Sequence, residues 1–255
     1  MIKPLIYIIP FLILIAYGPS KNKSKHPRNG NEIAECQENP AAIAQKKEDE
    51  GWLSRHQKIL GRRTPEAQLI LVGNSIFHSL DNEDRNQVWE KYLNPFQTIN
   101  MGISGDRTEN VIWRLENGSL EHINPKVAVV LIGTNNTDGN HYLSISTPEE
   151  LAGGIHKICS LITEKLPETK ILLMGILPYS YKPNHRDNLN KTTNRLIAKF
   201  PKDNSRIHYM DISDVYYNED GKVNRELMPD FLHPNPEGHR LMFEALYPKI
   251  EELMK

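Results

Sequence analysis

The stretch KVAVVLIGTNN, from Lys126 to Asn136, decides the fold class. Its first part, Val127–Ile132, is an unbroken apolar run without the alternation of a strand that has one face in water. Such a run is typical of a central strand in a parallel sheet that is covered on both faces. The run ends in the turn Gly133-Thr134-Asn135-Asn136, which places polar groups at the carboxyl end of the strand.

The rest of the chain repeats this pattern on either side of the central run. Short apolar runs alternate with helical patterns, which favours a parallel sheet with helices on both faces. We therefore expect an α/β fold, a three-layer α/β/α sandwich of five strands, with a site at the carboxyl ends of the strands. The other four expected strands are Gln68–Val72, Gln97–Asn100, Ile171–Gly175 and Ile207–Met210.

Capping signals mark where several helices begin. Thr147-Pro148-Glu149-Glu150 has the residues of a capping box with Pro at the first helical position, and Asp106 with Glu109 indicates a second box. Gly153-Gly154 costs its helix about 1 kcal/mol per glycine, so we expect close packing against the sheet there. Helices are expected over 41–60 with an interruption near Gly51, from Asp106 through Leu115, from Thr147 to about Leu166, and from Glu237 to about Met254.

The N-terminal part does not follow the fold pattern. Residues 1–18 contain one Lys and an apolar run from Leu5 to Tyr17, which has the length of a signal-peptide core and is short for a membrane span. Ala16 and Gly18 are the small residues of a cleavage site. We expect export to the periplasm or secretion, with an uncleaved membrane anchor or a buried apolar segment as alternatives. Residues 19–40 are expected to form a disordered tether and residues 41–255 the folded domain.

Charge and cysteine content exclude several function classes. Beyond residue 40 the chain has 26 basic and 29 acidic residues, which gives no general attraction to nucleic acid or anionic membranes. The two cysteines are Cys36 in the tether and Cys159 in an apolar helical stretch. We expect neither a structural disulfide nor a metal site, and we expect Cys159 in the core.

Reactive and hydrogen-bonding residues stand just beyond three of the predicted strands: Ser75, the turn Gly102–Asp106 and Asn135. An Asp-x-x-His pair, Asp230 and His233, lies near the end of the chain. A serine hydroxyl becomes a good nucleophile when an imidazole takes its proton, and an Asp that accepts from the other ring nitrogen orients that imidazole. Glycine-rich backbone and an Asn amide can donate to the oxyanion that forms. The combination predicts a serine hydrolase.

Each of these signals also has an ordinary structural interpretation. A Ser between a strand and a helix often only caps the helix, and a GTNN turn is often only a turn. The chain lacks GxSxG, which argues against the nucleophile elbow of α/β-hydrolases. The joint pattern at one sheet edge favours the catalytic interpretation. The other histidines considered, His78, His141, His185 and His239, have no comparable setting.

The same segments resemble the conserved blocks of the SGNH (GDSL-type) hydrolases, in that family's order. The stretch MGISGDRTENVIWRLENGSLEHINPKVAVVLIGTNN is similar to the intracellular platelet-activating factor acetylhydrolase catalytic subunits and to bacterial GDSL-like esterases. The likeness runs from about Trp52 to the C-terminus and includes RHQKIL, PEELAGGI, LPETKILLMGILP and MPDFLHPNPEGH.

The resemblance assigns a role to each site residue. It implies Ser75 as nucleophile, His233 as base and Asp230 as acid, with an oxyanion hole formed by Gly105, Asn135 and the Ser75 N–H. It also implies a flavodoxin-like sheet with strand order 2-1-3-4-5, and catalysis without a metal or an organic cofactor.

Three features depart from the family pattern. Asn74 stands where the family has Asp, so the charge is lost while a hydrogen-bonding side chain of the same size is kept. Ser104 replaces a common Gly. The loop Thr137–Thr147 is longer, and we expect it to form part of the pocket rim.

We therefore expect a serine esterase that removes short acyl groups, acetyl above all, from carbohydrates. The alternatives are a lipid or phospholipid esterase, a carbohydrate-binding protein without turnover, and a metal-dependent hydrolase that uses Asp230, His233 and His239. The expected partner is a small-molecule or glycan ester. Nucleic acid is not an expected partner, and the sequence is compatible with a membrane tether at the N-terminus and with a homodimer.

Overall fold

The sheet has five parallel strands in the order β2-β1-β3-β4-β5, as expected. The computed structural model describes residues 38–179 and 185–255, so the predictions for residues 1–37, including Cys36, lie outside the described residues. The strands are β1 (Leu69–Gly73), β2 (Ile99–Asn100), β3 (Val127–Leu131), β4 (Lys170–Met174) and β5 (Ile207–Met210).

The central strand β3 is buried along its whole length, which explains its unbroken apolar run. It pairs with β1 from Leu69 opposite Val127 to Gly73 opposite Leu131. Strand β2 is shorter than expected because Gln97 has the left-handed φ of 48° and ends the turn before the strand.

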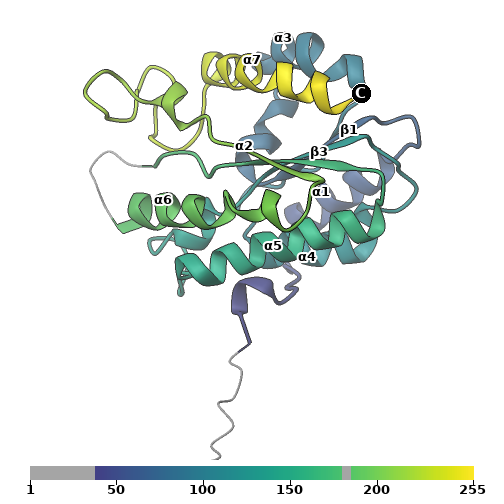
Figure 1. Ribbon diagram of the computed structural model, residues 1–255, viewed down its shortest axis with the longest axis horizontal. Coiled ribbons are helices and arrows are strands. Elements are labelled where there is room, and N and C mark those ends of the chain that lie inside the picture. Colours follow the sequence, from purple (N-terminus) through teal and green to yellow (C-terminus); the bar gives the residue numbers. More distant parts are fainter. Residues whose placement is uncertain (1–37, 180–184) are drawn as a thin grey trace, which may run out of the picture. The chain divides into compact units, whose positions relative to one another are not determined.

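Helices cover both faces of the sheet (Figure 1). Side chains of α1, α4, α5 and α6 pack in one apolar cluster, and those of α2, α3 and α7 pack in the other. Among the described residues, no helix has the length and apolar character needed to cross a membrane. The helices are α1 (Glu50–Gly61), α2 (Ser75–His78), α3 (Asn86–Val88), α4 (Thr108–Arg114), α5 (Pro148–Lys165), α6 (His185–Ile197) and α7 (Pro236–Leu253). Short 3-10 and π segments are η1 (Pro40–Ala42), η2 (Ser79–Asp81), η3 (Glu83–Arg85), η4 (Trp89–Leu93), η5 (Asn94–Phe96), η6 (Leu115–Ser119), η7 (Thr134–Thr137), η8 (Phe200–Lys202) and η9 (Ser213–Tyr216).

One of the two predicted capping boxes is confirmed and the other is wrong. At the start of α5, the Thr147 hydroxyl accepts from the Glu150 N–H at 3.1 Å, and the Glu150 carboxylate accepts from the Thr147 N–H at 2.8 Å. At the start of α4, the Asn110 side chain accepts from the Arg107 N–H instead. Asp106 does not cap this helix because its carboxylate is buried against other partners.

The helix predicted over 41–60 is also corrected. Only η1 and α1 are helical there, and Asp49 caps α1 by accepting from the Trp52 N–H at 2.7 Å. The residues between them run along α4, where the Gln45 N–H donates to the Glu109 carbonyl and the Gln45 carbonyl accepts from Asn110. These tertiary hydrogen bonds use backbone groups that a helix would need.

The two glycines of α5 do pack closely, but not against the sheet. A Cβ on Gly154 would lie 2.3 Å from the Ala41 carbonyl oxygen and 2.7 Å from the Thr108 hydroxyl, and one on Gly153 would lie 2.3 Å from the Asn39 amide. The contact is therefore with η1 and α4. Cys159 of the same helix is a free, buried cysteine, and burial raises the pKa of its thiol to about 12.

Candidate active site

Ser75 begins the short helix α2 directly after β1. The strand ends at Gly73, where a Cβ would lie 2.4 Å from the Leu131 carbonyl oxygen, so only glycine allows this approach to β3. Asn74 caps α2 by accepting from the Ile76 N–H at 3.1 Å. This geometry places Ser75 at the first helical position, where its N–H has no partner within the helix.

A turn before α7 brings His233 to Ser75. The Ser75 Oγ lies 2.8 Å from the His233 Nε2, and the His233 Nδ1 lies 2.6 Å from the Asp230 Oδ2. The other Asp230 oxygen accepts from the backbone N–H groups of Leu232 and His233, at 3.0 and 2.7 Å. The carboxylate thus fixes both the ring and the backbone of the histidine.

These bonds set the charge state of Asp230. Burial by itself raises the pKa of this carboxyl, but the hydrogen bonds from the His233 backbone and ring and from Leu232 outweigh it, so the pKa lies below its usual range. At neutral pH the ionised carboxylate accepts from Nδ1–H, so we assign the tautomer that leaves the His233 Nε2 free to accept the serine proton.

The turn after β2 lies beside this group. Gly105 has a φ of +76°, a conformation that favours glycine. Among the residues that the structure describes, no acceptor takes the Gly105 N–H. The Asn135 side chain on η7 donates to the Asp106 carbonyl at 2.8 Å, which uses one of its two amide hydrogens.

Side chains from three other segments hold this turn. The Gly105 carbonyl accepts from the Lys47 ammonium at 2.6 Å and from the Tyr142 hydroxyl at 2.7 Å. On the other side, the Ser104 N–H donates to the His78 Nδ1 at 3.2 Å. Tyr142 belongs to the long loop expected at the rim, and its hydroxyl does reach the turn.

A buried ion pair fixes the end of the turn after β2 at Asp106. Asp106 and Arg114 are both fully buried, with 2.7 Å between their charged groups, and the Trp52 indole N–H donates to Asp106 at 2.6 Å. Sequence reasoning missed this pair. The spacing of eight residues carries no local signal, although Asp and Arg beside a glycine-rich turn could have suggested one.

His239 lies apart from the other candidate residues. Its Nε2 lies 2.9 Å from the Ile76 carbonyl oxygen and its Nδ1 lies 3.2 Å from that of Asn235, and burial lowers its pKa to about 4. The ring therefore links α7 to α2 and does not face Asp230. Within the described ranges, no cluster of three or more His, Cys, Asp or Glu side chains is arranged to hold a metal ion.

Comparison with known proteins matches residues 71–241 to the GDSL-like lipase/acylhydrolase family. The chain belongs to this family. It is an ester hydrolase by this membership. It is 34% identical over 222 residues to the rat (Rattus norvegicus) platelet-activating factor acetylhydrolase IB subunit alpha2, which covers 85% of this chain and 93% of the relative. The human (Homo sapiens) subunit alpha1 is 30% identical over 223 residues, with coverage of 86% and 92%.

Solved structures agree with the fold of this family member. A GDSL-like lipase from Bacteroides thetaiotaomicron has a TM-score of 0.65 at 19% identity, with 78% of this chain and 97% of that chain covered. An acetyl xylan esterase has a TM-score of 0.60 at 20% identity, with coverage of 71% and 98%. At these identities the likeness supports the fold alone.

Proposed function

We propose that this family member is a serine esterase in which Ser75 is the nucleophile, His233 the general base and Asp230 the residue that orients the base. The observation that carries the proposal is the continuous line of contacts from the Ser75 Oγ through the His233 ring to the Asp230 carboxylate. A serine that only capped a helix would have no need of an oriented imidazole at its hydroxyl.

The proposed reaction has two half-reactions. His233 Nε2 takes the Ser75 hydroxyl proton while Oγ attacks the ester carbonyl carbon, and the carbonyl oxygen becomes an oxyanion. The N–H groups of Ser75 and Gly105 and the free amide hydrogen of Asn135 donate to it. The histidine then protonates the leaving alcohol. A water, deprotonated by the same nitrogen, releases the acid and restores the serine.

The proposed acyl group is acetyl. Relatives named acetylhydrolases and a structural neighbour named an acetyl xylan esterase share the acetyl group while their names imply different alcohols. A long acyl chain would need an extended apolar groove, because each buried methylene contributes only about 0.8 kcal/mol. The turn after β2, which lies against α2, has polar partners instead, because Ser104 contacts His78 and the Asp106 carbonyl accepts from Asn135.

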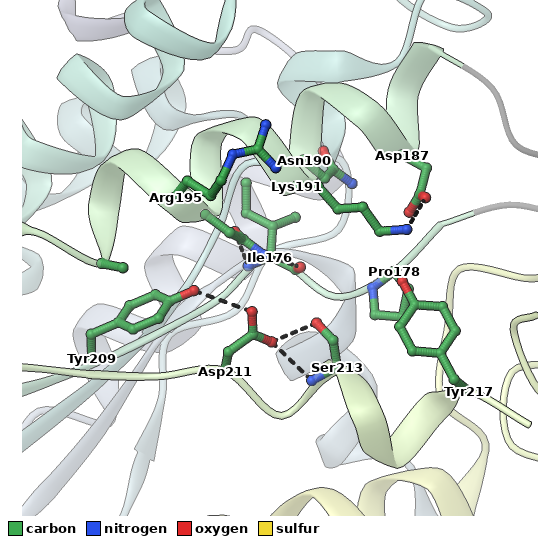
Figure 2. A pocket seen from close by; sticks show the side chains of 12 residues that line it. Ile176, Pro178, Asp187, Asn190, Lys191, Arg195, Tyr209, Asp211, Ser213 and Tyr217 are labelled. Carbon is green, nitrogen blue, oxygen red and sulfur yellow. Dashed lines mark hydrogen bonds and ion pairs between the residues drawn. The ribbon is translucent and has the colours of Figure 1, made fainter. Parts of the chain in front are cut away.

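The proposed alcohol is a carbohydrate, and a nearby pocket supports this. A pocket of about 370 Å³ lies between α6 and the segment after β5, at the carboxyl edge of the sheet (Figure 2). Tyr209 and Tyr217 stand at its two ends, with Asp211 between them. Aromatic faces combined with carboxylate and amide groups suit a polyhydroxylated ring. Because neighbouring strands are about 4.8 Å apart, β5 lies roughly 10 Å from β3, whose end carries Asn135, within reach of a short oligosaccharide.

A lipid ester is the second candidate. The relatives at 34% identity are named for platelet-activating factor. Leu143, next to Tyr142, is fully exposed, and Ile145 of the same loop is also exposed. An apolar loop tip beside the site could meet a lipid surface.

Two substrate series test the proposal. We expect kcat/KM for p-nitrophenyl acetate to exceed that for the octanoate, because a long chain gains only about 0.8 kcal/mol per methylene that it buries in apolar surroundings, and the described turn after β2 presents polar groups beside α2. We expect acetylated xylo-oligosaccharides to be cleaved faster than an acetylated phospholipid. Tyr217→Ala should raise KM for the oligosaccharide about tenfold and leave p-nitrophenyl acetate unaffected. A maximum of kcat/KM at acyl chains of eight carbons or more would contradict the acetyl assignment. Faster cleavage of the phospholipid than of the oligosaccharide would contradict the carbohydrate assignment.

The N-terminal proposals remain separate from the chemistry. We propose that residues 1–18 direct export, either as a cleaved signal peptide or as an uncleaved anchor, with residues 19–37 as a tether. Asn39 and Pro40, which were expected in the tether, belong to the folded domain, since Pro40 begins η1 and the Asn39 amide donates to the Glu150 carbonyl at 2.9 Å. A carbohydrate-binding protein without turnover has one support, the loss of the family Asp at Asn74.

A further inference from the structure

His78 and Ser104 meet at the edge of the site, and the roles proposed above use neither side chain. The His78 Nδ1 lies 2.9 Å from the Ser104 Oγ and 3.2 Å from the Ser104 backbone nitrogen. The next residue along the chain is Gly105, whose N–H is a proposed oxyanion donor. The hydrogen bond from the Ser104 N–H to His78 therefore holds the residue directly before the proposed oxyanion donor.

The chemistry of this contact fixes the protonation of the ring. A backbone N–H can only donate, so the His78 Nδ1 must accept, and the ring proton must then be on Nε2. The Ser104 hydroxyl can donate to the same lone pair. A doubly protonated imidazolium has no lone pair, so it would face the Ser104 N–H with an N–H of its own.

The charges around His78 favour the neutral ring. Burial lowers the pKa of His78, and Arg55 on α1, Arg62 directly after α1 and Arg114 on α4 act in the same direction. Asp81 on η2 acts in the opposite direction, but Arg55 and Arg62 pair with its carboxylate at 2.5 and 2.6 Å. The lone pair on Nδ1 is therefore available at neutral pH.

Close backbone packing makes the contact a rigid one. A Cβ on Gly102 would lie 2.4 Å from the His78 backbone nitrogen and 2.8 Å from the Asn74 carbonyl oxygen. The loop after β2 therefore packs directly against α2. Lys47 and Tyr142 hold the far side of the same turn through the Gly105 carbonyl. The turn is thus held from two sides, and only the His78 side depends on an imidazole lone pair.

We propose that His78 is a positioning residue of the esterase, which in its neutral form accepts from the Ser104 N–H and so holds the Gly105 donor at the oxyanion, and which releases this turn when it is protonated. The inference rests on the proposed function of Gly105. It adds a second acid-sensitive group to the site, besides the base His233.

Two substitutions at position 78 separate this role from a merely structural one. In His78→Asn the amide oxygen can accept in place of Nδ1 but does not titrate, whereas His78→Leu removes the acceptor. With p-nitrophenyl acetate we expect log kcat/KM of the wild type to fall with a slope greater than 1 in the acid range where His78 becomes protonated in addition to His233. The slope should be 1 in both variants. At pH 7.5 His78→Leu should lose at least about tenfold in kcat, since loss of a whole oxyanion donor costs about 10²–10³, and His78→Asn should recover most of it.

Tyr142→Phe is the matched control, because it loosens the same turn from the other side without changing a group that titrates near neutral pH. It should lower kcat but keep the wild-type slope. Circular dichroism at each pH checks that every variant stays folded. A slope in His78→Asn as steep as that of the wild type, or wild-type kcat in His78→Leu, would overturn the proposal.

A second measurement does not depend on turnover. Long-range ¹H–¹⁵N spectra of the imidazole rings should show His78 as the neutral Nε2–H tautomer at pH 7. An Nδ1–H tautomer or a charged ring at that pH would refute the hydrogen bond directly. If the wild type shows no esterase activity while the tautomer is as expected, the proposed function fails and the contact stands.

Discussion

At the residue scale, Ser75 is distinguished by what faces its hydroxyl. Its place at the start of α2 is ordinary, but the His233 Nε2 lies 2.8 Å from its Oγ. The sequence indicated the residue types because Ser75 and Asn135 follow expected strands, and Asp230 and His233 form an Asp-x-x-His pair near the end of the chain. It could not indicate their distances, because these depend on how β1, β3 and the turn before α7 pack.

A substitution at position 74 tests how much activity depends on the Asp that the family has there. Its side chain accepts from the Ile76 N–H, and an Asp oxygen can accept from the same group. We therefore expect Asn74→Asp to leave kcat/KM within about tenfold of the wild type, since the acceptor that caps α2 is kept. Measuring kcat/KM for p-nitrophenyl acetate checks this. An inactive wild type that the Asp variant switches on would instead favour a protein that had lost turnover.

At the element scale, local sequence signals predicted the helices well only where no tertiary partner intervened. The capping box at Thr147 forms because its groups are exposed and have each other as partners. The box expected at Asp106 fails because Trp52 and Arg114 take that carboxylate into the core. The segment 43–49 is not helical for the same reason, since α4 takes the backbone N–H and carbonyl of Gln45 in its middle. Trp52 lies 54 residues from Asp106, and Asn110 lies 65 residues from Gln45, so local signals do not reveal these partners.

Two glycine substitutions in helices should have opposite signs. Gly154→Ala places a Cβ 2.3 Å from the Ala41 carbonyl, a backbone atom, so the free energy of unfolding should fall by about 1–3 kcal/mol. Gly61→Ala, at the end of α1, meets nothing within 4 Å and should raise it by about 0.5–1 kcal/mol. Urea denaturation of both variants measures the two values. Stabilisation by Gly154→Ala would show that η1 does not pack against α5.

At the scale of the whole molecule, one sheet edge collects the site. All five strands are parallel, so their carboxyl ends and the loops with Ser75, Gly105 and Asn135 lie on the same side. The sequence predicted the strand order through the family resemblance, because apolar runs alone do not specify which strands are neighbours. The order is confirmed. The buried Asp106–Arg114 pair was missed, because a spacing of eight residues carries no local signal and only their place beside the glycine-rich turn could have suggested it.

The central claim is that Ser75 and His233 act as one catalytic unit, and the most direct test is the kcat of three variants. Ser75→Ala and His233→Ala should each lower kcat for p-nitrophenyl acetate by about 10³-fold or more, with little change in the free energy of unfolding. The double variant should be hardly slower than either single variant, because each change already removes the activated nucleophile. Near wild-type kcat in Ser75→Ala, or losses that multiply in the double variant, would contradict the account.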